Sequence, residues 1–171
     1  MANVDQLRGF WPVSHLLGGE IRTKTFVVTT GATCYQGDLL KVVAAGTVEP
    51  SAANDGVIVI GVAAEYVDDS ASAAGKEIQV YADPYIEFGI QSDSDTATTS
   101  AAVFATANHV ATTGNTTTKI SKHELDASDI GTGGQLEILG LIDSPDNDWG
   151  VHSKLRVRIA AHKWNAAVAG V

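Results

Sequence analysis

GDLLKVVAAGTVEPSAANDGVIVIGVAAEY, residues Gly37–Tyr66, is the part of the sequence that best predicts the architecture of the chain. It holds two apolar runs, Leu39–Ala45 and Val57–Tyr66, separated by the polar segment Glu49–Gly56. The β-branched residues of the second run lose little side-chain freedom in an extended backbone. Near-continuous apolarity is typical of strands that are covered on both faces. We therefore expect a central pair of strands in a small barrel or sandwich.

Other segments alternate between apolar and polar residues or are rich in β-branched residues, which is typical of strands. They are Ile21–Thr30, Glu77–Ala82, Tyr85–Ile90, Ala101–Thr106, His109–Thr112, Gln135–Ile142 and Lys154–Ala161. One short helix is expected over Ser121–Asp129, because Ser121 and Glu124 have the spacing of a capping box. The whole pattern predicts an all-β fold: a small β-barrel or β-sandwich with one short helix and an extended N-terminal arm.

The first twenty residues have a character of their own, so we divide the chain into an arm, residues 1–20, and a β body, residues 21–171. Glycines and a proline in the arm interrupt any helix. The candidate anchors of the arm on another protein are its apolar residues Phe10, Trp11, Pro12, Val13 and Leu16. The alternative is that these side chains pack on the core of their own domain, and the sequence does not decide between the two.

Composition excludes several classes of function. The chain has 171 residues and a net charge of −9, which disfavours direct binding to nucleic-acid phosphates. No apolar run is long enough to span a membrane, and we expect no secretory signal, since the first residues lack a basic start followed by an apolar run. A single cysteine, Cys34, permits no intrachain disulfide and no zinc site built from several cysteines, and we expect it to be a small buried apolar side chain. A charged fraction of only 18% suits a subunit that docks onto partners.

No pattern of residues predicts catalysis, so the chain is expected to be no enzyme and to need no cofactor or metal. The five histidines are scattered, without the spacing of a helical zinc pair. The glycine cluster Gly131–Gly134 lacks the lysine and the long helix of a phosphate-binding loop, so we interpret it as a turn. The acidic turn Asp143–Asp148 offers oxygen ligands for calcium, but its spacing favours a solvated turn.

The cleanest alternation in the sequence places three cations on one face of a strand: Lys154, Arg156 and Arg158. Two interpretations stay open. The cations protect a sheet edge against unwanted pairing, or they form a contact strip for an acidic partner surface.

Two parts of the sequence resemble a known family. The N-terminal run Asn3-Val4-Asp5, Arg8-Gly9-Phe10, Pro12-Val13, His15-Leu16 and Gly18-Gly19-Glu20-Ile21-Arg22 resembles the opening of the head decoration, or cement, proteins of tailed phages. The residues Gly37-Asp38-Leu39 with Val42, and Ile60-Gly61-Val62, are similar to the strand pair of these small capsid-stabilising proteins. Together the two matches cover about the first third of the chain.

The resemblance implies a β-barrel or related β fold on the outer surface of an icosahedral capsid, in a virion assembled in the host cytoplasm. Such proteins bind where subunits of the major capsid protein meet, as homo-oligomers, with a trimer favoured and a dimer possible. An N-terminal arm extends along the capsid protein, which implies a capsid-binding role for the anchors named above.

Two other classes of function stay open. One is a receptor- or glycan-binding head-fibre module displayed on the virion, with its contacts on the loops Gln91–Ser100 and Asp143–Asp148. The other, ranked last, is a small oligomeric β-fold hydrolase.

Overall fold

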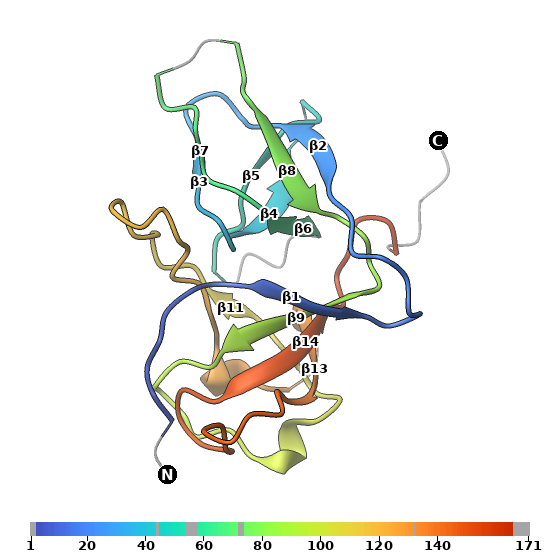
Figure 1. Cartoon of the computed structure of the whole chain (residues 1–171), viewed down its shortest axis with the longest axis vertical. Coiled ribbons are helices and arrows are strands. Elements are labelled where there is room, and N and C mark those ends of the chain that lie inside the picture. The colour runs from blue at the N-terminus through green and yellow to red at the C-terminus, as the bar shows by residue number, and fades with distance from the viewer. Residues whose placement is uncertain (1–2, 44, 54–57, 72–73, 132, 166–171) are drawn as a thin grey trace.

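The computed structural model describes residues 3–43, 45–53, 58–71, 74–131 and 133–165, and their regular structure is almost entirely antiparallel β (Figure 1). The all-β prediction is confirmed. Two five-stranded sheets lie one above the other in the view of Figure 1, and neither closes into a barrel within the described residues.

The first sheet, the lower one in Figure 1, has the order β1 (Trp11–His15), β9 (Ile86–Gln91), β14 (Lys154–Ile159), β13 (Leu136–Leu141), β10 (Thr106–Ala107). The second sheet has the order β2 (Lys24–Val27), β8 (Glu77–Tyr81), β6 (Val59–Ala63), β4 (Leu39–Val42), β5 (Val48–Pro50). Two small ribbons complete the fold, β3 (Thr33–Cys34) with β7 (Val67–Asp68), and β11 (His109–Val110) with β12 (Glu124–Leu125). Two short 3₁₀ turns are present, η1 (Ser100–Ala102) and η2 (Ala127–Asp129).

Strands β4 and β6 lie between two hydrophobic cores, as their apolar sequences predicted. Every residue of β6 is buried. Leu39, Val59 and Val62 belong to a first core shared with the first sheet, which also contains Phe88, Ile138 and Val157. The neighbouring residues Leu40, Ile60 and Ala63 belong to a second core enclosed by the second sheet. One pair of strands therefore supplies apolar side chains to both halves of the molecule, and each fully buried aliphatic side chain contributes about 1.5–3 kcal/mol.

A bulge in β6 allows this division. In a regular strand, Val59 and Val62 would point to opposite faces, because side chains alternate. The pairing shifts between Leu40–Gly61 and Lys41–Val59, which inserts one extra residue into β6 and brings both valines to the first core. Gly61 has φ +155°, and a Cβ at this position would lie 2.2 Å from the carbonyl oxygen of Tyr81 on β8. Only glycine fits where β6 and β8 approach so closely.

Most of the expected strands are present with shorter bounds, but three expectations fail. No helix covers Ser121–Asp129, where the chain forms β12 and then the 3₁₀ turn η2. The expected strand Ala101–Thr106 is mainly the 3₁₀ turn η1 followed by a turn. The expected loop Glu49–Gly56 begins inside β5, whose residues pair with β4. Residues 54–56 of this stretch lie outside the described residues. So do Ala44 and Val57 of the two apolar runs, and residues 1–2 of the expected arm.

The helix fails because both halves of the supposed capping box are engaged elsewhere. The Ser121 hydroxyl accepts the backbone N–H of His123, two residues on rather than three. The Glu124 carboxylate accepts from the side chain of Gln91 on β9. Pairing of Glu124–Leu125 with His109–Val110 then satisfies the backbone as a ribbon. Tertiary contacts have overridden a weak local preference.

Replacement of Gly61 by alanine tests the close approach of β6 and β8. We expect Gly61→Ala to lower the free energy of unfolding by at least about 2 kcal/mol more than Gly140→Ala. Gly140 lies in a strand of the first sheet and has a similar φ, +146°, but a Cβ there meets no atom within 4 Å. Gly140→Ala therefore carries only the backbone strain, whereas Gly61→Ala adds a clash with Tyr81. Urea denaturation measures both, and equal losses would show that the close contact contributes nothing.

Candidate functional sites

The N-terminal segment is part of the β body, because its central residues form an edge strand of the first sheet. Strand β1 pairs antiparallel with β9, as Figure 1 shows. Phe10, just before β1, is only 3% exposed and meets Phe88 edge to face, with the ring centroids 6.4 Å apart. Of the two alternatives left by the sequence, the structure gives Phe10 a place in the core of its own chain. Phe10 cannot anchor another protein without leaving that core.

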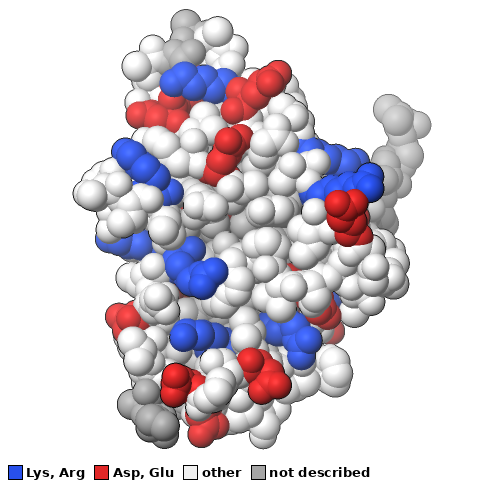
Figure 2. Space-filling model, viewed as in Figure 1, with Lys and Arg blue, Asp and Glu red and all other residues white. Residues whose placement is uncertain are grey.

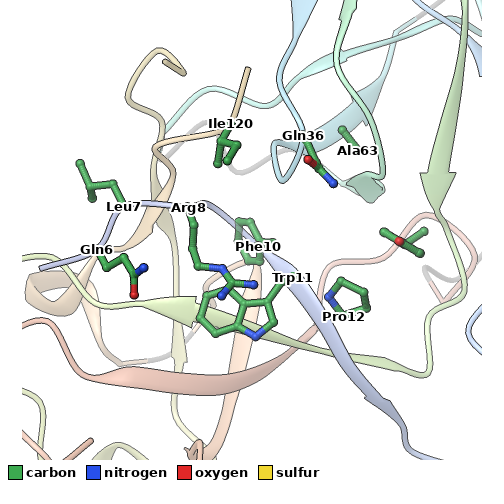
Figure 3. A pocket seen from close by; sticks show the side chains of 10 residues that line it. Gln6, Leu7, Arg8, Phe10, Trp11, Pro12, Gln36, Ala63 and Ile120 are labelled. Carbon is green, nitrogen blue, oxygen red and sulfur yellow. The ribbon is translucent and has the colours of Figure 1, made fainter. Parts of the chain in front are cut away.

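Trp11 and Pro12 line a pocket between the N-terminal segment and the two sheets. The Trp11 ring covers Gly89 of β9 so closely that a Cβ on Gly89 would lie 2.2 Å from it. The Arg8 guanidinium lies 4.0 Å from the centre of the Trp11 ring, a cation–π contact. Figure 3 shows these side chains on one side of the pocket, with Gln36, Ala63 and Ile120 across from them. The pocket has a volume of about 340 Å³, and burial lowers the pKa of Arg8.

The remaining predicted anchors face outward. Val13 occupies the bulge of β1 and is 39% exposed, and Leu16, just after the strand, is 47% exposed. Leu17 is more exposed still, and the backbone N–H of Leu16 donates to the carbonyl of Tyr85, another exposed apolar residue. We call Val13, Leu16, Leu17 and Tyr85 the β1 surface. It lies on β1 and where the β1–β9 pair ends, and among the described residues β1 is an edge strand of the first sheet.

The three cations of β14 do not lie on a sheet edge, so that interpretation is wrong. Strand β14 is central, between β9 and β13. Arg158 donates through Nε to the Glu137 carboxylate on β13, and Arg156 Nη1 lies 3.8 Å from the Glu87 carboxylate on β9. The backbone N–H of Lys154 donates to Asn147. Basic and acidic side chains are interspersed on the face drawn in Figure 2, so a partner would meet a mixed surface there.

A buried polar network connects segments that are far apart in the sequence. The rings of His109 and His123 lie 4.9 Å apart. His109 contacts the Gln135 side chain through Nδ1 at 2.8 Å and the Ser51 carbonyl through Nε2 at 3.1 Å. The Leu39 N–H points at His123 Nδ1, which leaves the ring proton on Nε2, 3.5 Å from Asp38 Oδ1. No regular spacing in the sequence connects residues 38, 51, 109, 123 and 135, so this network was not predicted.

Burial shifts both titratable partners of the network. It raises the pKa of Asp38 to about 6, against the effect of hydrogen bonds from Ser121 and from the Tyr35 N–H. Burial, together with His109, lowers the pKa of His123 to about 3. His123 is therefore neutral at pH 7. The two groups line a pocket of about 240 Å³. The fully buried Ser121 side chain accepts the His123 N–H and hydrogen-bonds Asp38, so it joins the turn before β4 to the segment before β12.

The other residues that the sequence pointed to are buried in a core or form hydrogen bonds within turns. Burial raises the pKa of the Cys34 thiol to about 12, and Cys34 is fully buried, which confirms the expected small apolar role. In the acidic turn, the Asn147 side chain donates to the carbonyls of Ile142 and Lys154 and so closes the connection between β13 and β14. The backbone N–H groups of Gly131 and Gly134 donate to the carbonyl and the hydroxyl of Thr106 on β10. Thr132 lies outside the described residues.

A metal could be held by one group of side chains in the described part of the chain. Asp5, Glu124 and His152 each offer one ligand atom, and these atoms lie within 4.8 Å of one another. The acidic turn Asp143–Asp148 forms no comparable cluster among the described residues. Burial and the nearby carboxylates of Asp5 and Asp93 raise the pKa of Glu124, while Gln91 and His152 act in the opposite direction.

Comparison with known proteins adds no relative: no family model matches the chain, and no curated protein matches its sequence. Of the helical segments in the described residues, none has the length and apolar character needed to cross a lipid bilayer.

The opposed pKa shifts of Asp38 and His123 predict a specific pH dependence. Between pH 3.8, the ordinary pKa of the carboxyl, and about pH 6, Asp38 is protonated in the folded chain and ionised in the unfolded chain. Its contribution to the free energy of unfolding therefore falls as the pH rises through this range. Between pH 6.5 and about pH 3, His123 is neutral in the folded chain and protonated in the unfolded chain. Its contribution to the free energy of unfolding therefore falls as the pH falls through this range. Between about pH 4 and pH 6 the two slopes oppose each other in the wild type.

Single substitutions separate the two slopes. In Asp38→Asn, the free energy of unfolding should gain a slope of about +1.4 kcal/mol per pH unit relative to wild type, because only the His123 effect is left. In His123→Asn, whose Oδ1 can still accept the Leu39 N–H, the slope should change by the same amount with the opposite sign. Urea denaturation from pH 4 to pH 6 measures both, and parallel curves for the three proteins would refute the assignment.

Proposed function

We propose that this chain is a structural protein of a phage virion, which binds the outer surface of the capsid and stabilises contacts between major capsid protein subunits. The resemblance of its N-terminal run to head decoration proteins supports the proposal. The structural observation that carries it is the β1 surface, four exposed apolar side chains on or next to the edge strand β1. Exposed apolar groups gathered at one edge are typical of a surface that another protein covers.

The N-terminal segment would bind in a different way from a free arm. Phe10 and Trp11 hold β1 against the first sheet, and so fix the strand before any partner arrives. Val13 and Leu16 then project from a strand that is already ordered. Pre-ordering lowers the entropic cost of binding, because little backbone freedom is lost when the partner docks. A strand of the capsid protein that pairs with β1 would satisfy backbone groups on both sides.

The stabilising effect on the capsid follows from mass action. A protein that binds assembled subunits but not separated ones shifts the equilibrium toward the assembled state. A homotrimer would present three β1 surfaces, so several weak contacts would act together with a high effective concentration. The proposal includes no catalytic step, cofactor or nucleic-acid contact.

Substitution of one exposed valine tests the proposal. Val13→Asp places a charge on the β1 surface and should weaken binding to empty expanded heads at least about tenfold, as measured by co-sedimentation. Val27→Asp is the matched control, because Val27 is 40% exposed, close to the 39% of Val13, but lies on β2 of the other sheet. Removal of residues 1–20 is a poor test, since it would take Phe10 out of the core.

The outcomes separate two claims. Heads that bind the wild type and Val27→Asp but not Val13→Asp support both the capsid role and the β1 surface. If Val13→Asp binds as well as the control, another surface carries the contact. If the wild-type protein does not bind heads at all, the capsid role itself is wrong.

A further inference from the structure

Three ligand-type atoms from distant parts of the chain converge on one point beside the N-terminal segment. They belong to Asp5, to Glu124 on β12 and to His152 in the turn before β14, and the atoms that face the Gln91 amide are Asp5 Oδ1, Glu124 Oε1 and His152 Nδ1. The side-chain amide nitrogen of Gln91, the last residue of β9, lies between these three atoms. It lies 2.9 Å from the Asp5 oxygen, 3.2 Å from the Glu124 oxygen and 3.4 Å from the His152 nitrogen.

The amide nitrogen is an incomplete partner for this arrangement. It carries two hydrogens, so when His152 Nδ1 is unprotonated and accepts, the amide can satisfy only two of the three atoms at a time. Its orientation is fixed, because the Gln91 amide oxygen accepts the backbone N–H of Gln6 at 2.7 Å. It is also neutral, whereas two carboxylates face it. Among the described residues, the basic group that faces Asp5 is the His152 ring, whose Nδ1 lies 3.9 Å from Asp5 Oδ1 and forms an ion pair only when the ring is protonated.

We propose that Asp5, Glu124 and His152 form a binding site for a divalent transition-metal ion of the Zn²⁺ type. Two carboxylate oxygens and one imidazole nitrogen are a ligand set that suits Zn²⁺, and water completes its four-coordinate shell. Ca²⁺ fits less well, since it prefers six to eight oxygen ligands and no nitrogen. Entry of the ion would require the buried Gln91 amide to leave this point and to give up its hydrogen bonds with Asp5, Glu124 and the Gln6 N–H.

The ion would fasten the N-terminal segment to the body. Asn3 already donates to the carbonyls of Asp148 and Val151 and accepts the Asp148 N–H. Asp5 is the next polar residue of the same segment, and its two co-ligands belong to β12 and to the turn that Asn3 contacts. A metal here would join three segments that hydrogen bonds already connect. This inference is independent of the capsid role, because it concerns the isolated protein.

Titration calorimetry of the metal-free full chain with Zn²⁺ at pH 7 tests the site. We expect one equivalent of Zn²⁺ to bind, with a rise in the unfolding temperature on saturation. His152→Asn and Asp5→Asn should each weaken binding at least about tenfold. Asparagine suits position 152, where φ is +55°, because it tolerates this backbone conformation. Gln91→Glu should strengthen binding at least about tenfold, since it replaces the amide donor with a fourth oxygen ligand.

His15→Asn is the matched control. His15 Nε2 lies 3.5 Å from the Asp83 carboxylate, a similar imidazole–carboxylate pair that belongs to no three-residue ligand cluster in the described residues. This variant should bind Zn²⁺ like the wild type. Absence of Zn²⁺ binding to the wild type would overturn the proposal. So would variants at positions 5 and 152 that bind like the wild type, or Ca²⁺ binding as tightly as Zn²⁺. Circular dichroism confirms that each variant is folded.

Discussion

Burial of β4 and β6 on both faces is the constraint on which the rest of the structure depends. Consecutive residues of β4, Leu39 and Leu40, belong to different cores, so neither core can repack without moving the strand that serves the other. Close-packed interiors transmit such displacements, because they contain few voids to absorb them. The bulge in β6 and the close approach at Gly61 fix which side chain enters which core. The two sheets therefore behave as one cooperative unit.

The same packing explains why some side chains of the N-terminal segment are buried and others are exposed. Phe10 fills the first core and Trp11 closes over Gly89, so both residues hold β1 in place. Val13 and Leu16 are left outside because the bulge and the end of the strand turn them away from the sheet. A terminal segment tied to the body in this way presents a fixed edge. A partner would recognise that edge without first having to order it, which favours a structural role over that of a flexible tether.

The sequence predicted the elements whose signal is local and failed where long-range contacts decide. The apolar runs around Leu39 and Val59 and the alternation from Lys154 to Ile159 marked β4, β6 and β14. Alternation shows which residues share a face, but it does not show that β14 lies in the middle of a sheet. The capping-box spacing of Ser121 and Glu124 was outweighed by the ribbon β11–β12. The buried network and the convergence around Gln91 each combine at least four segments, and a single sequence carries no signal for such contacts.

Buried hydrogen bonds connect segments of the fold that are far apart in the sequence, and they fix how these segments are placed relative to one another. The turn before β4 is the clearest example. The Gly37 carbonyl accepts the Phe10 N–H, the Gly37 N–H donates to Ala63 on β6, and Gln36 accepts from Ser121. Gly37 has φ +92°, and a Cβ there would lie 2.9 Å from the carbonyl oxygens of Arg8 and Phe10. Apolar contacts tolerate sliding, whereas hydrogen bonds fix direction and distance. With Asp38 and His123 next to it, this turn therefore sets the register in which the N-terminal segment, β6 and the segment before β12 meet, and so determines where the β1 edge faces.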